Sequence, residues 1–216
     1  RDQPRSRGLG DVYKRQGLSR FSPKDKHFTH YLPDEHRNSL SYHNVHALCM
    51  DGDDLWIGTY TGGVNVLNTK TGVFRVYTAK AGDPTTLDRS SSYAIFKDRE
   101  ARIWVTSMSG VNLYNREEDN FTRIRDLGSW IMDIDQDADG NIWFSSQGNG
   151  LFKYDPDKQE WTNYVHSSAP GALINDQVNC VLIDGNGEMW IGTMNGLCKY
   201  NAKEDQFELI PLDIPS

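Results

Sequence analysis

The first candidate for chemistry in this chain is a run of acidic residues. Asp135-Gln136-Asp137-Ala138-Asp139-Gly140 opens like an EF-hand calcium loop, in which acidic residues at alternate positions supply oxygen ligands. The twelfth position of that loop is Ser146, where a calcium site requires a bidentate Glu. We therefore expect a hairpin turn here and no metal site.

The histidines and the other carboxylates give little evidence of a metal or catalytic site. His43 and His46 are three residues apart, as are His27 and His30, on or beside predicted strands. Strand residues at that spacing point to opposite faces, which argues against a shared metal. The charged runs Glu117-Glu118-Asp119 and Lys203-Glu204-Asp205 fall in predicted turns on a solvated outer rim. No Ser–His–Asp arrangement or phosphate loop is present, so we expect no catalytic residues and no cofactor.

Composition restricts the class of protein. The net charge of −7 gives no electrostatic support for nucleic-acid binding. Hydrophobic residues make up 37% of the chain, which is enough for a packed core. No apolar run is long enough to cross a membrane, and no signal peptide or initiator Met opens the chain, so we expect a fragment of a longer protein. Cys49, Cys180 and Cys198 have no CxxC spacing and are expected to be buried free thiols in strands.

A repeat organises the chain. Trp56 lies in Leu-Trp-Ile-Gly-Thr, and related strings surround Trp104, Trp143 and Trp190, at intervals of 48, 39 and 47 residues. A Gly follows each Trp by six or seven residues, and Asn or Asp follows each Gly by five. These pairs are Gly63 and Asn68, Gly110 and Asn115, Gly150 and Asp155, and Gly196 and Asn201. The stretch 17–31 fits the second half of the same frame.

Each copy predicts four short strands, with the Trp strand second. The first strand begins near Val45, Ile131 or Val178, with Ser92 in the odd copy, and turns rich in Asp, Asn and Gly follow it. The Trp strand is apolar on successive residues, which indicates a sheet buried on both faces. We expect all four Trp side chains in the core. The small residues two positions after them suit close approach by a neighbouring sheet, and these are Gly58, Thr106, Ser145 and Gly192.

A four-stranded repeat of this length with a Trp signature is typical of a β-propeller blade. The predicted fold class is all-β: a β-propeller fragment of four complete four-stranded blades plus a partial blade, an open arc of a seven-bladed propeller. The predicted blades are residues 17–31 (partial), 32–77, 78–124, 125–164 and 165–210. Residues 1–16 are expected to be foreign to the fold or disordered, since Gly10 and Asp11 stand where a Trp is required. Residues 211–216 form a tail or the start of a next blade.

The string Asp-Gly-Asn-Gly-Glu-Met-Trp-Ile-Gly-Thr-Met-Asn-Gly-Leu-Cys-Lys-Tyr-Asn at 184–201, together with Asn-Ser-Leu-Ser at 38–41, resembles the two-component regulator propeller, and the resemblance covers residues 17–210. In that family such blades form the periplasmic sensor region of hybrid two-component sensors, common in Bacteroidetes. Two seven-bladed propellers usually precede an immunoglobulin-like domain, a transmembrane helix and a histidine kinase. Many of these sensors detect oligosaccharides. None of the downstream parts is present here, so no kinase activity is assigned to this chain.

The resemblance implies a periplasmic, non-catalytic sensing module of an inner-membrane-anchored receptor. Its expected partners are an oligosaccharide, the remaining blades and domains of the same sensor, and a second copy in a homodimer, with no nucleic acid. A second hypothesis is a scaffold for protein–protein contacts, since propellers often serve only that role. A third is a propeller glycosidase or lyase, which would need acids, bases or metal ligands converging from several blades.

One face of the propeller is the expected location of a ligand. The connections from Tyr31 to Val45, Tyr77 to Ser92 and Tyr164 to Val178 span 14, 15 and 14 residues, whereas the connection from Ile124 to Ile131 spans 7. The short connection should leave a notch beside Trp130, whose plane suits a sugar ring. The predicted ligand-binding residues are Trp130, Tyr60, Met108, Gln147, Asn149 and Asn195, with His43, Arg89 and Asp176. The alternative is that Trp130 only fills the gap left by the short connection.

Overall fold

The computed structural model describes residues 17–34 and 38–211, and these form eighteen β-strands and no helix. The prediction of an all-β fold is confirmed. The predictions for residues 1–16 and most of 211–216 lie outside the described residues. Within the described ranges no helix is long and apolar enough to cross a membrane.

The strands form one two-stranded sheet, here called the partial blade, and four four-stranded sheets, here called blades 1 to 4. The partial blade consists of β1 (Leu18–Ser22) and β2 (His27–Tyr31). Blade 1 consists of β3 (Val45–Asp51), β4 (Asp54–Thr59), β5 (Val64–Asn68) and β6 (Phe74–Tyr77). Blade 2 consists of β7 (Ile95–Lys97), β8 (Ile103–Thr106), β9 (Gly110–Asn115) and β10 (Asn120–Asp126). Blade 3 consists of β11 (Ile131–Gln136), β12 (Ile142–Ser146), β13 (Leu151–Asp155) and β14 (Glu160–Tyr164). Blade 4 consists of β15 (Val178–Ile183), β16 (Met189–Thr193), β17 (Gly196–Asn201) and β18 (Gln206–Ile210).

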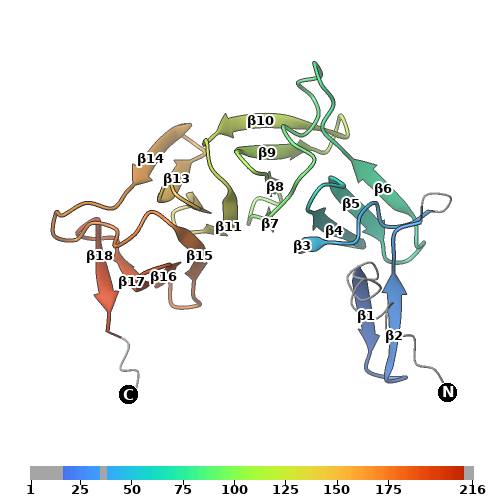
Figure 1. The fold of residues 1–216 in the computed structure, drawn as a ribbon, viewed down its shortest axis with the longest axis horizontal. Helices are drawn as coiled ribbons and strands as arrows, with labels where there is room; N and C mark the ends of the chain where they lie inside the picture. The colour runs from blue at the N-terminus through green and yellow to red at the C-terminus, as the bar shows by residue number, and fades with distance from the viewer. Residues whose placement is uncertain (1–16, 35–37, 212–216) are drawn as a thin grey trace, which may run out of the picture.

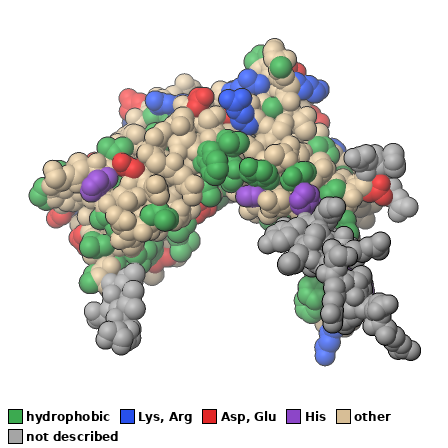
Figure 2. Space-filling model, in the orientation of Figure 1, with side chains coloured by type: hydrophobic (Ala, Val, Ile, Leu, Met, Phe, Trp, Pro, Cys, Tyr) green, Lys and Arg blue, Asp and Glu red, His purple; other side chains and the backbone are tan. Residues whose placement is uncertain are grey.

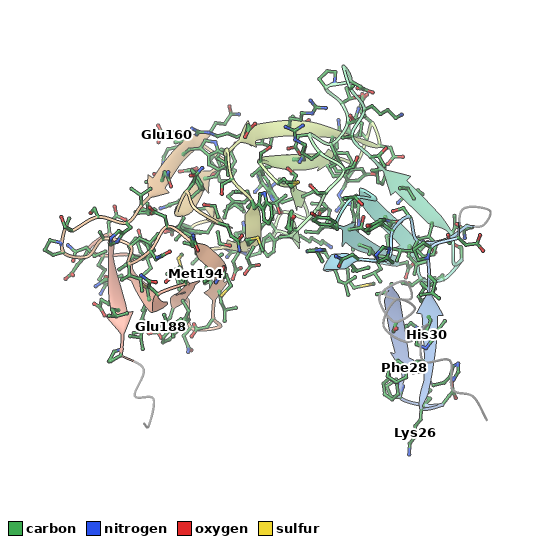
Figure 3. All side chains as sticks on the ribbon, viewed as in Figure 1. Lys26, Phe28, His30, Glu160, Glu188 and Met194 are labelled. Atoms are coloured by element: carbon green, nitrogen blue, oxygen red, sulfur yellow. The ribbon has the colours of Figure 1, made fainter. Side chains whose placement is uncertain are left out.

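The sheets follow one another around an open arc (Figure 1). In every complete blade the strands pair antiparallel in chain order, so the Trp strand is the second and is internal, as predicted. The first strands lie on the concave side of the arc and the fourth strands on its convex side (Figure 1). Side chains of neighbouring blades fill the space between the sheets, whereas Phe28 and His30 project from β2 of the partial blade (Figure 3).

The turn between the first two strands explains one feature of the repeat. The carboxylates of Asp98 and Asp137 each accept a hydrogen bond of 2.7 Å from the indole Nε1 six residues later, in Trp104 and Trp143. The same carboxylates accept backbone N–H groups of their own turns, which closes the hairpin. Blade 1 has a shorter turn, and the indole Nε1 of Trp56 is buried with no hydrogen-bond partner among the described residues.

The Gly that follows the Trp strand has a steric reason in blades 1 and 3. Gly63 and Gly150 have φ of 77° and 76°, a region that side chains with a Cβ rarely adopt. A Cβ at either position would overlap the carbonyl oxygen of the last residue of the blade, Tyr77 or Tyr164. In blades 1 and 3 the second turn can therefore close against the fourth strand only with Gly at this position.

The core lies between blades. Trp56, Trp104 and Trp143 are almost fully buried, and each belongs to a hydrophobic cluster that joins its own blade to the next. Such burial contributes about 2–3 kcal/mol per large side chain. Trp190 differs from the expectation because it is only half-buried: no sheet among the described residues packs against the far face of blade 4. The expectation for the cysteines is likewise wrong at Cys180, which lies in β15 but is exposed.

Tyrosines of neighbouring blades share a carboxylate. Asp205, in the last turn of blade 4, accepts hydrogen bonds from the hydroxyls of Tyr164 in blade 3 and Tyr200 in its own blade. Asp119 accepts the equivalent pair from Tyr77 and Tyr114 between blades 1 and 2. We call this arrangement the Tyr–Asp–Tyr tie. Ile124 stands where Tyr77 and Tyr164 stand, so blades 2 and 3 lack it.

Candidate functional site

The antiparallel order of the strands sorts the turns by location. Turns between second and third strands, and connections between blades, lie at one end of the blades. Turns between first and second strands, and between third and fourth strands, lie at the other end. Trp130 and the other predicted binding residues all belong to the first group, which we call the connection end.

A bulge at the start of the first strand directs side chains at this end. In blade 1, Val45 pairs with Thr59 and Ala47 with Gly58, so His46 is the extra residue of a β-bulge. Bulges of this kind re-aim a side chain. The same irregularity occurs in blades 3 and 4. In blade 2, Tyr93 holds the position that corresponds to His46. His46 directly follows Val45 and Tyr93 directly follows Ser92, and Val45 and Ser92 occupy the same position in the repeat.

These positions create a row of rings across three blades. The imidazole of His46 stacks on Tyr60 with ring centroids 5.8 Å apart and meets Tyr93 edge-on at 5.0 Å. Tyr93 in turn stacks on Trp130, with centroids 5.6 Å apart and ring planes 17° apart. We call Tyr60, His46, Tyr93 and Trp130 the aromatic row. On the face shown in Figure 2, hydrophobic side chains gather near the concave side of the arc, with histidines beside them.

Trp130 is one of the two exposed ends of this row, with Tyr60 at the other. Its side chain is 41% exposed, although Tyr93 beneath it is buried. Its carbonyl oxygen accepts a hydrogen bond from the N–H of Gln147, and the next N–H, of Ile131, donates to Ser107 in blade 2. The backbone on both sides of the indole is thus held by neighbouring strands. The corresponding positions in blades 1, 2 and 4 are polar: Asn44, Ser91 and Gln177. The frame of a blade therefore does not require a Trp here.

An open depression of about 390 Å³ lies beside Trp130, a size within the usual range of ligand sites. We call it the inner depression; its lining residues are Met108, Gly128, Ser129, Trp130 and Gln147. Ser129 donates a hydrogen bond to the carbonyl oxygen of Gln147, so the two sides of the depression are joined. The side-chain amide of Gln147 reaches Asn179 of blade 4 at 3.4 Å. The depression thus combines an exposed indole with an exposed amide.

Burial sets the charge state of the row. The pKa of His46 is lowered by desolvation, and the pKa of Tyr93 is raised by desolvation and by the nearby Tyr60. Both groups are therefore held in their neutral forms near neutral pH. The Tyr93 hydroxyl is buried with no hydrogen-bond partner among the described residues. The row offers apolar planes and no charge, which suits stacking against a neutral ring.

The structure brings together some of the predicted site residues. Met108, Trp130 and Gln147 line the inner depression together. Tyr60 is connected to them through His46 and Tyr93. His46 and Tyr93 were absent from the predicted binding residues. Both residues directly follow the same position of the repeat, Val45 in blade 1 and Ser92 in blade 2, and this shared position could have identified them.

The remaining predicted residues lie apart from the inner depression or serve the frame. The amide of Asn149 donates to the carbonyl oxygen of Leu127, and the Asp176 carboxylate accepts the N–H of His166. His43 packs against Tyr42. Arg89 lines a separate depression. Asn195 is exposed, and its backbone N–H bonds to Thr193 of its own turn.

The run that resembles a calcium loop serves as a turn and a link between blades. The Asp135 carboxylate accepts the N–H of Ile183 in blade 4 at 2.6 Å, and the Asp137 carboxylate accepts the indole N–H of Trp143. Across the described residues, no group of three His, Cys, Asp or Glu side chains is arranged to hold a metal.

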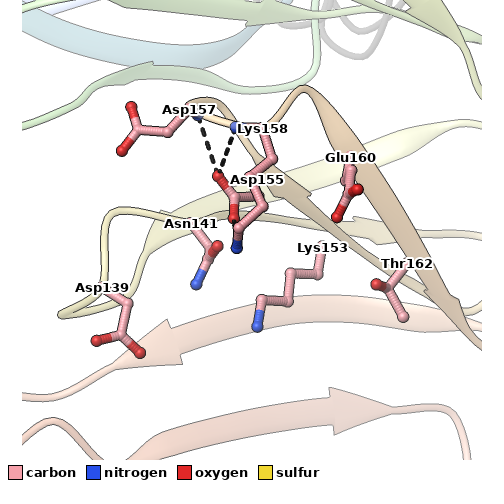
Figure 4. A pocket seen from close by; sticks show the side chains of 8 residues that line it. All are labelled: Asp139, Asn141, Lys153, Asp155, Asp157, Lys158, Glu160 and Thr162. Carbon is pink, nitrogen blue, oxygen red and sulfur yellow. Dashed lines mark hydrogen bonds and ion pairs between the residues drawn. The ribbon is translucent and has the colours of Figure 1, made fainter.

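A charged depression lies at the opposite end of blade 3 (Figure 4). Its lining comes from the first and third turns of that blade and the strands beside them, with Asp139, Asn141, Lys153, Asp155, Asp157, Lys158, Glu160 and Thr162. Lys158 pairs with Asp155, and Lys153 lies over the Trp143 ring at 5.4 Å. Its two lysines thus already have partners within the blade, and its lining contains no aromatic side chain.

Comparison with known proteins agrees with the repeat. Residues 39–61 and 172–195 match the family described as Two component regulator propeller. The chain is 30% identical over 210 residues to Histidine kinase P4 of Formosa agariphila, covering 91% of this chain and 15% of that protein. The chain thus spans less than a sixth of the relative's length.

Solved structures show the same fold. The extracellular domain of a putative hybrid two component system from B. thetaiotaomicron superposes with a TM-score of 0.79 and 23% identity, over 90% of this chain and 27% of that one. A catalytically inactive virginiamycin B lyase from Staphylococcus aureus superposes with a TM-score of 0.69 and 15% identity, over 94% of this chain and 65% of that one. At these identities the likeness shows the β-propeller fold alone.

Proposed function

We propose that this chain, which carries two-component regulator propeller repeats, is a non-catalytic sensing module of a signal-transduction receptor, and that it binds an oligosaccharide at the inner depression. The single observation that carries the proposal is Trp130. An indole that is 41% exposed, on a fixed backbone, occupies a position that is polar in the other three blades. Exposed aromatic planes suit sugar rings, which have apolar faces and polar rims.

The surroundings of Trp130 fit that ligand. Tyr93 supports the indole from below, so little side-chain freedom is lost when a ring stacks on it. The Gln147 amide can donate and accept hydrogen bonds at the rim of the same depression. Met108, from the neighbouring blade, adds a flexible apolar contact.

The family and the relatives supply the rest of the proposal. The relative named as a histidine kinase and the superposed extracellular domain support a receptor role and a location outside the cytoplasm, which we propose is the periplasm, in a receptor anchored in the inner membrane. The remaining blades and domains of that receptor, and a second copy of it, are the proposed protein partners.

A lyase activity is the weaker alternative. The superposition on virginiamycin B lyase shows that the fold can carry an enzyme. A propeller enzyme needs acids, bases or metal ligands converging near the axis. At the connection end, the described side chains closest to Trp130 are aromatic, amide, thioether and hydroxyl groups.

The test is Trp130→Ala in the full-length protein, with thermal stability and affinity for oligosaccharides from a glycan array measured together. We expect roughly tenfold or greater loss of affinity, as for the loss of one aromatic stacking contact, with only a small fall in melting temperature from the lost contact with Tyr93. Trp130→Phe should retain much of the affinity. Met194→Ala is the control, because Met194 is 62% exposed in the turn between β16 and β17, at the connection end of blade 4 (Figure 3). A lowered melting temperature with unchanged affinity would assign Trp130 to packing alone.

A further inference from the structure

A second depression adjoins the first at the connection end of blade 2. It has a volume of about 360 Å³, and we call it the outer depression. Its lining residues are Asp88, Arg89, Ser109, Gly110, Val111, Arg123, Arg125 and Asp126. Met108 of the inner depression and Ser109 of the outer one are consecutive. The N–H of Leu127 donates to the carbonyl oxygen of Ser109, so the same two segments border both depressions.

Three guanidinium groups meet in the outer depression. Although the chain is acidic overall, no carboxylate among the described residues lies within ion-pair distance of Arg89, Arg123 or Arg125. Lys and Arg side chains gather on this outer part of the face shown in Figure 2. Three guanidinium groups face two carboxylates, Asp88 and Asp126, in this lining, so the depression carries one positive charge in excess in a protein of net charge −7.

Two of the three guanidinium groups are held in place. Arg123 donates to the backbone carbonyl oxygens of Asp83, Thr86 and Leu87, at distances of 2.7 to 3.2 Å. Arg125 lies over the ring of Trp161, with its guanidinium carbon 5.2 Å from the centroid. These contacts fix the geometry of the two groups, and neither group is within ion-pair distance of a described carboxylate, although the pKa of Asp83 is lowered by hydrogen bonds from Thr85 and also by the Arg123 charge. Arg89 is exposed and makes no hydrogen bond or ion pair with any described residue. An arginine with all five donors available can close on an anion.

The carboxylates of the depression are already engaged. Asp88 accepts the hydroxyl of Ser107 and the amide of Asn112, both at 2.6 Å. It lies against Gly110, where a Cβ would come within 2.5 Å of its oxygen. Asp126 accepts the N–H of Gly128 at 2.8 Å. Both carboxylates keep lone pairs that can accept hydroxyl groups, which are the other polar groups of a sugar.

We propose that the outer depression binds the anionic group of an acidic oligosaccharide, a uronate carboxylate or a sulfate ester, while a neighbouring sugar ring stacks on Trp130. This inference rests on the proposed function of the inner depression and names the class of its ligand. Guanidinium groups recognise planar carboxylate and tetrahedral sulfate oxygens through paired N–H donors. The hydroxyls of the same sugar unit are placed to donate to Asp88 and Asp126.

The test compares three probes on the full-length protein: a neutral xylo-oligosaccharide, an oligogalacturonate and a sulfated carrageenan oligosaccharide. The variant is Arg89→Glu, which reverses the charge of the side chain that has no structural contact. Arg20→Glu is the matched control, because Arg20 is also exposed and lies on β1 of the partial blade. Isothermal titration at low and high salt measures affinity, and thermal melting checks the fold.

We expect one of the two acidic probes to bind more tightly than the neutral probe, and to lose roughly tenfold or more in affinity in Arg89→Glu but not in Arg20→Glu. Added salt should weaken the same interaction. The preferred acidic probe distinguishes carboxylate from sulfate. Equal binding of acidic and neutral probes, unaffected by Arg89→Glu, would overturn the anionic subsite and leave the Trp130 site standing. Binding of no saccharide at all would overturn both.

Discussion

Removal of the Asp137 carboxylate tests how the repeat builds a blade. This carboxylate accepts the Nε1–H of Trp143 at 2.7 Å, and it also accepts the N–H groups of Asp139 and Asn141 and the amide of Asn141. The Trp143 side chain is 0% exposed, so in Asp137→Ala its indole N–H has no water to replace the lost acceptor. An unsatisfied buried donor costs about 1–3 kcal/mol. The turn bonds, which water reaches, add about 1 kcal/mol. The expected loss is therefore about 2–4 kcal/mol.

The assay is urea unfolding of the chain followed by far-ultraviolet circular dichroism. A double-mutant cycle isolates the indole contact, because Trp143→Phe keeps a buried ring and removes the N–H donor. In the Trp143→Phe background, Asp137→Ala should cost about 1 kcal/mol, since only the turn bonds remain to be lost. Asp139→Ala, in the same turn with an exposed side chain, should change the free energy of unfolding by less than about 0.5 kcal/mol. Equal costs of Asp137→Ala in the two backgrounds would refute the role assigned to the indole hydrogen bond.

Two further predictions concern the same frame. Gly150→Ala should destabilise the chain by more than about 2 kcal/mol, because a Cβ would overlap the carbonyl oxygen of Tyr164. Gly140→Ala is the control and should cost only about 1 kcal/mol, because Gly140 has a positive φ but open space around it. Equal melting temperatures of the two variants would contradict the steric argument. Asp205→Asn should reduce the free energy of unfolding at neutral pH, because hydrogen bonds from Tyr200 and Tyr164 lower the pKa of that carboxyl. A lowered pKa in the folded state gives stability that is present above the unfolded pKa of about 3.9 and is lost as pH falls through the folded pKa. The difference in stability between Asp205→Asn and wild type should therefore shrink in acid. A constant difference across pH would contradict the role assigned to the Tyr–Asp–Tyr tie.

The frame was predictable from the sequence because each repeated residue has one role per blade. The Asp six residues before the Trp bonds to its indole in blades 2 and 3, and the Gly after the Trp strand allows close approach of the last carbonyl in blades 1 and 3. The strands and their order were therefore predictable from the repeat. Trp190 was expected to be as buried as the other three, but its burial depends on a further sheet, which its own repeat does not encode.

The site was less predictable because it has no repeat. Trp130 could be identified from the short connection before it, and Met108 and Gln147 from their turns. The stacking of His46 on Tyr60 and its edge-on contact with Tyr93 depend on a bulge and on the distance between blades, neither of which can be predicted from the spacing of residues in the sequence. The opposite error occurred at Asn149 and Asp176, whose polar groups turn back to bond the frame. A polar residue in a loop is as often a support for the backbone as a ligand contact.

The location of the aromatic row follows from the differences among the blade interfaces. Tyr–Asp–Tyr ties join blade 1 to blade 2 and blade 3 to blade 4, but the described interface between blades 2 and 3 has none. At the far end of that interface, Gln136 bonds to Arg99 and Glu100. At the connection end, the stacking of Tyr93 on Trp130 is the aromatic contact that crosses it. A ring bound against Met108 of blade 2 and Trp130 of blade 3 would add contacts across the same interface. The buried Trp104 of blade 2 already packs against Phe144 and Tyr154 of blade 3, so a bound ring would stiffen an existing interface. We propose that this stiffening is the physical means by which occupancy would be passed to the rest of a receptor.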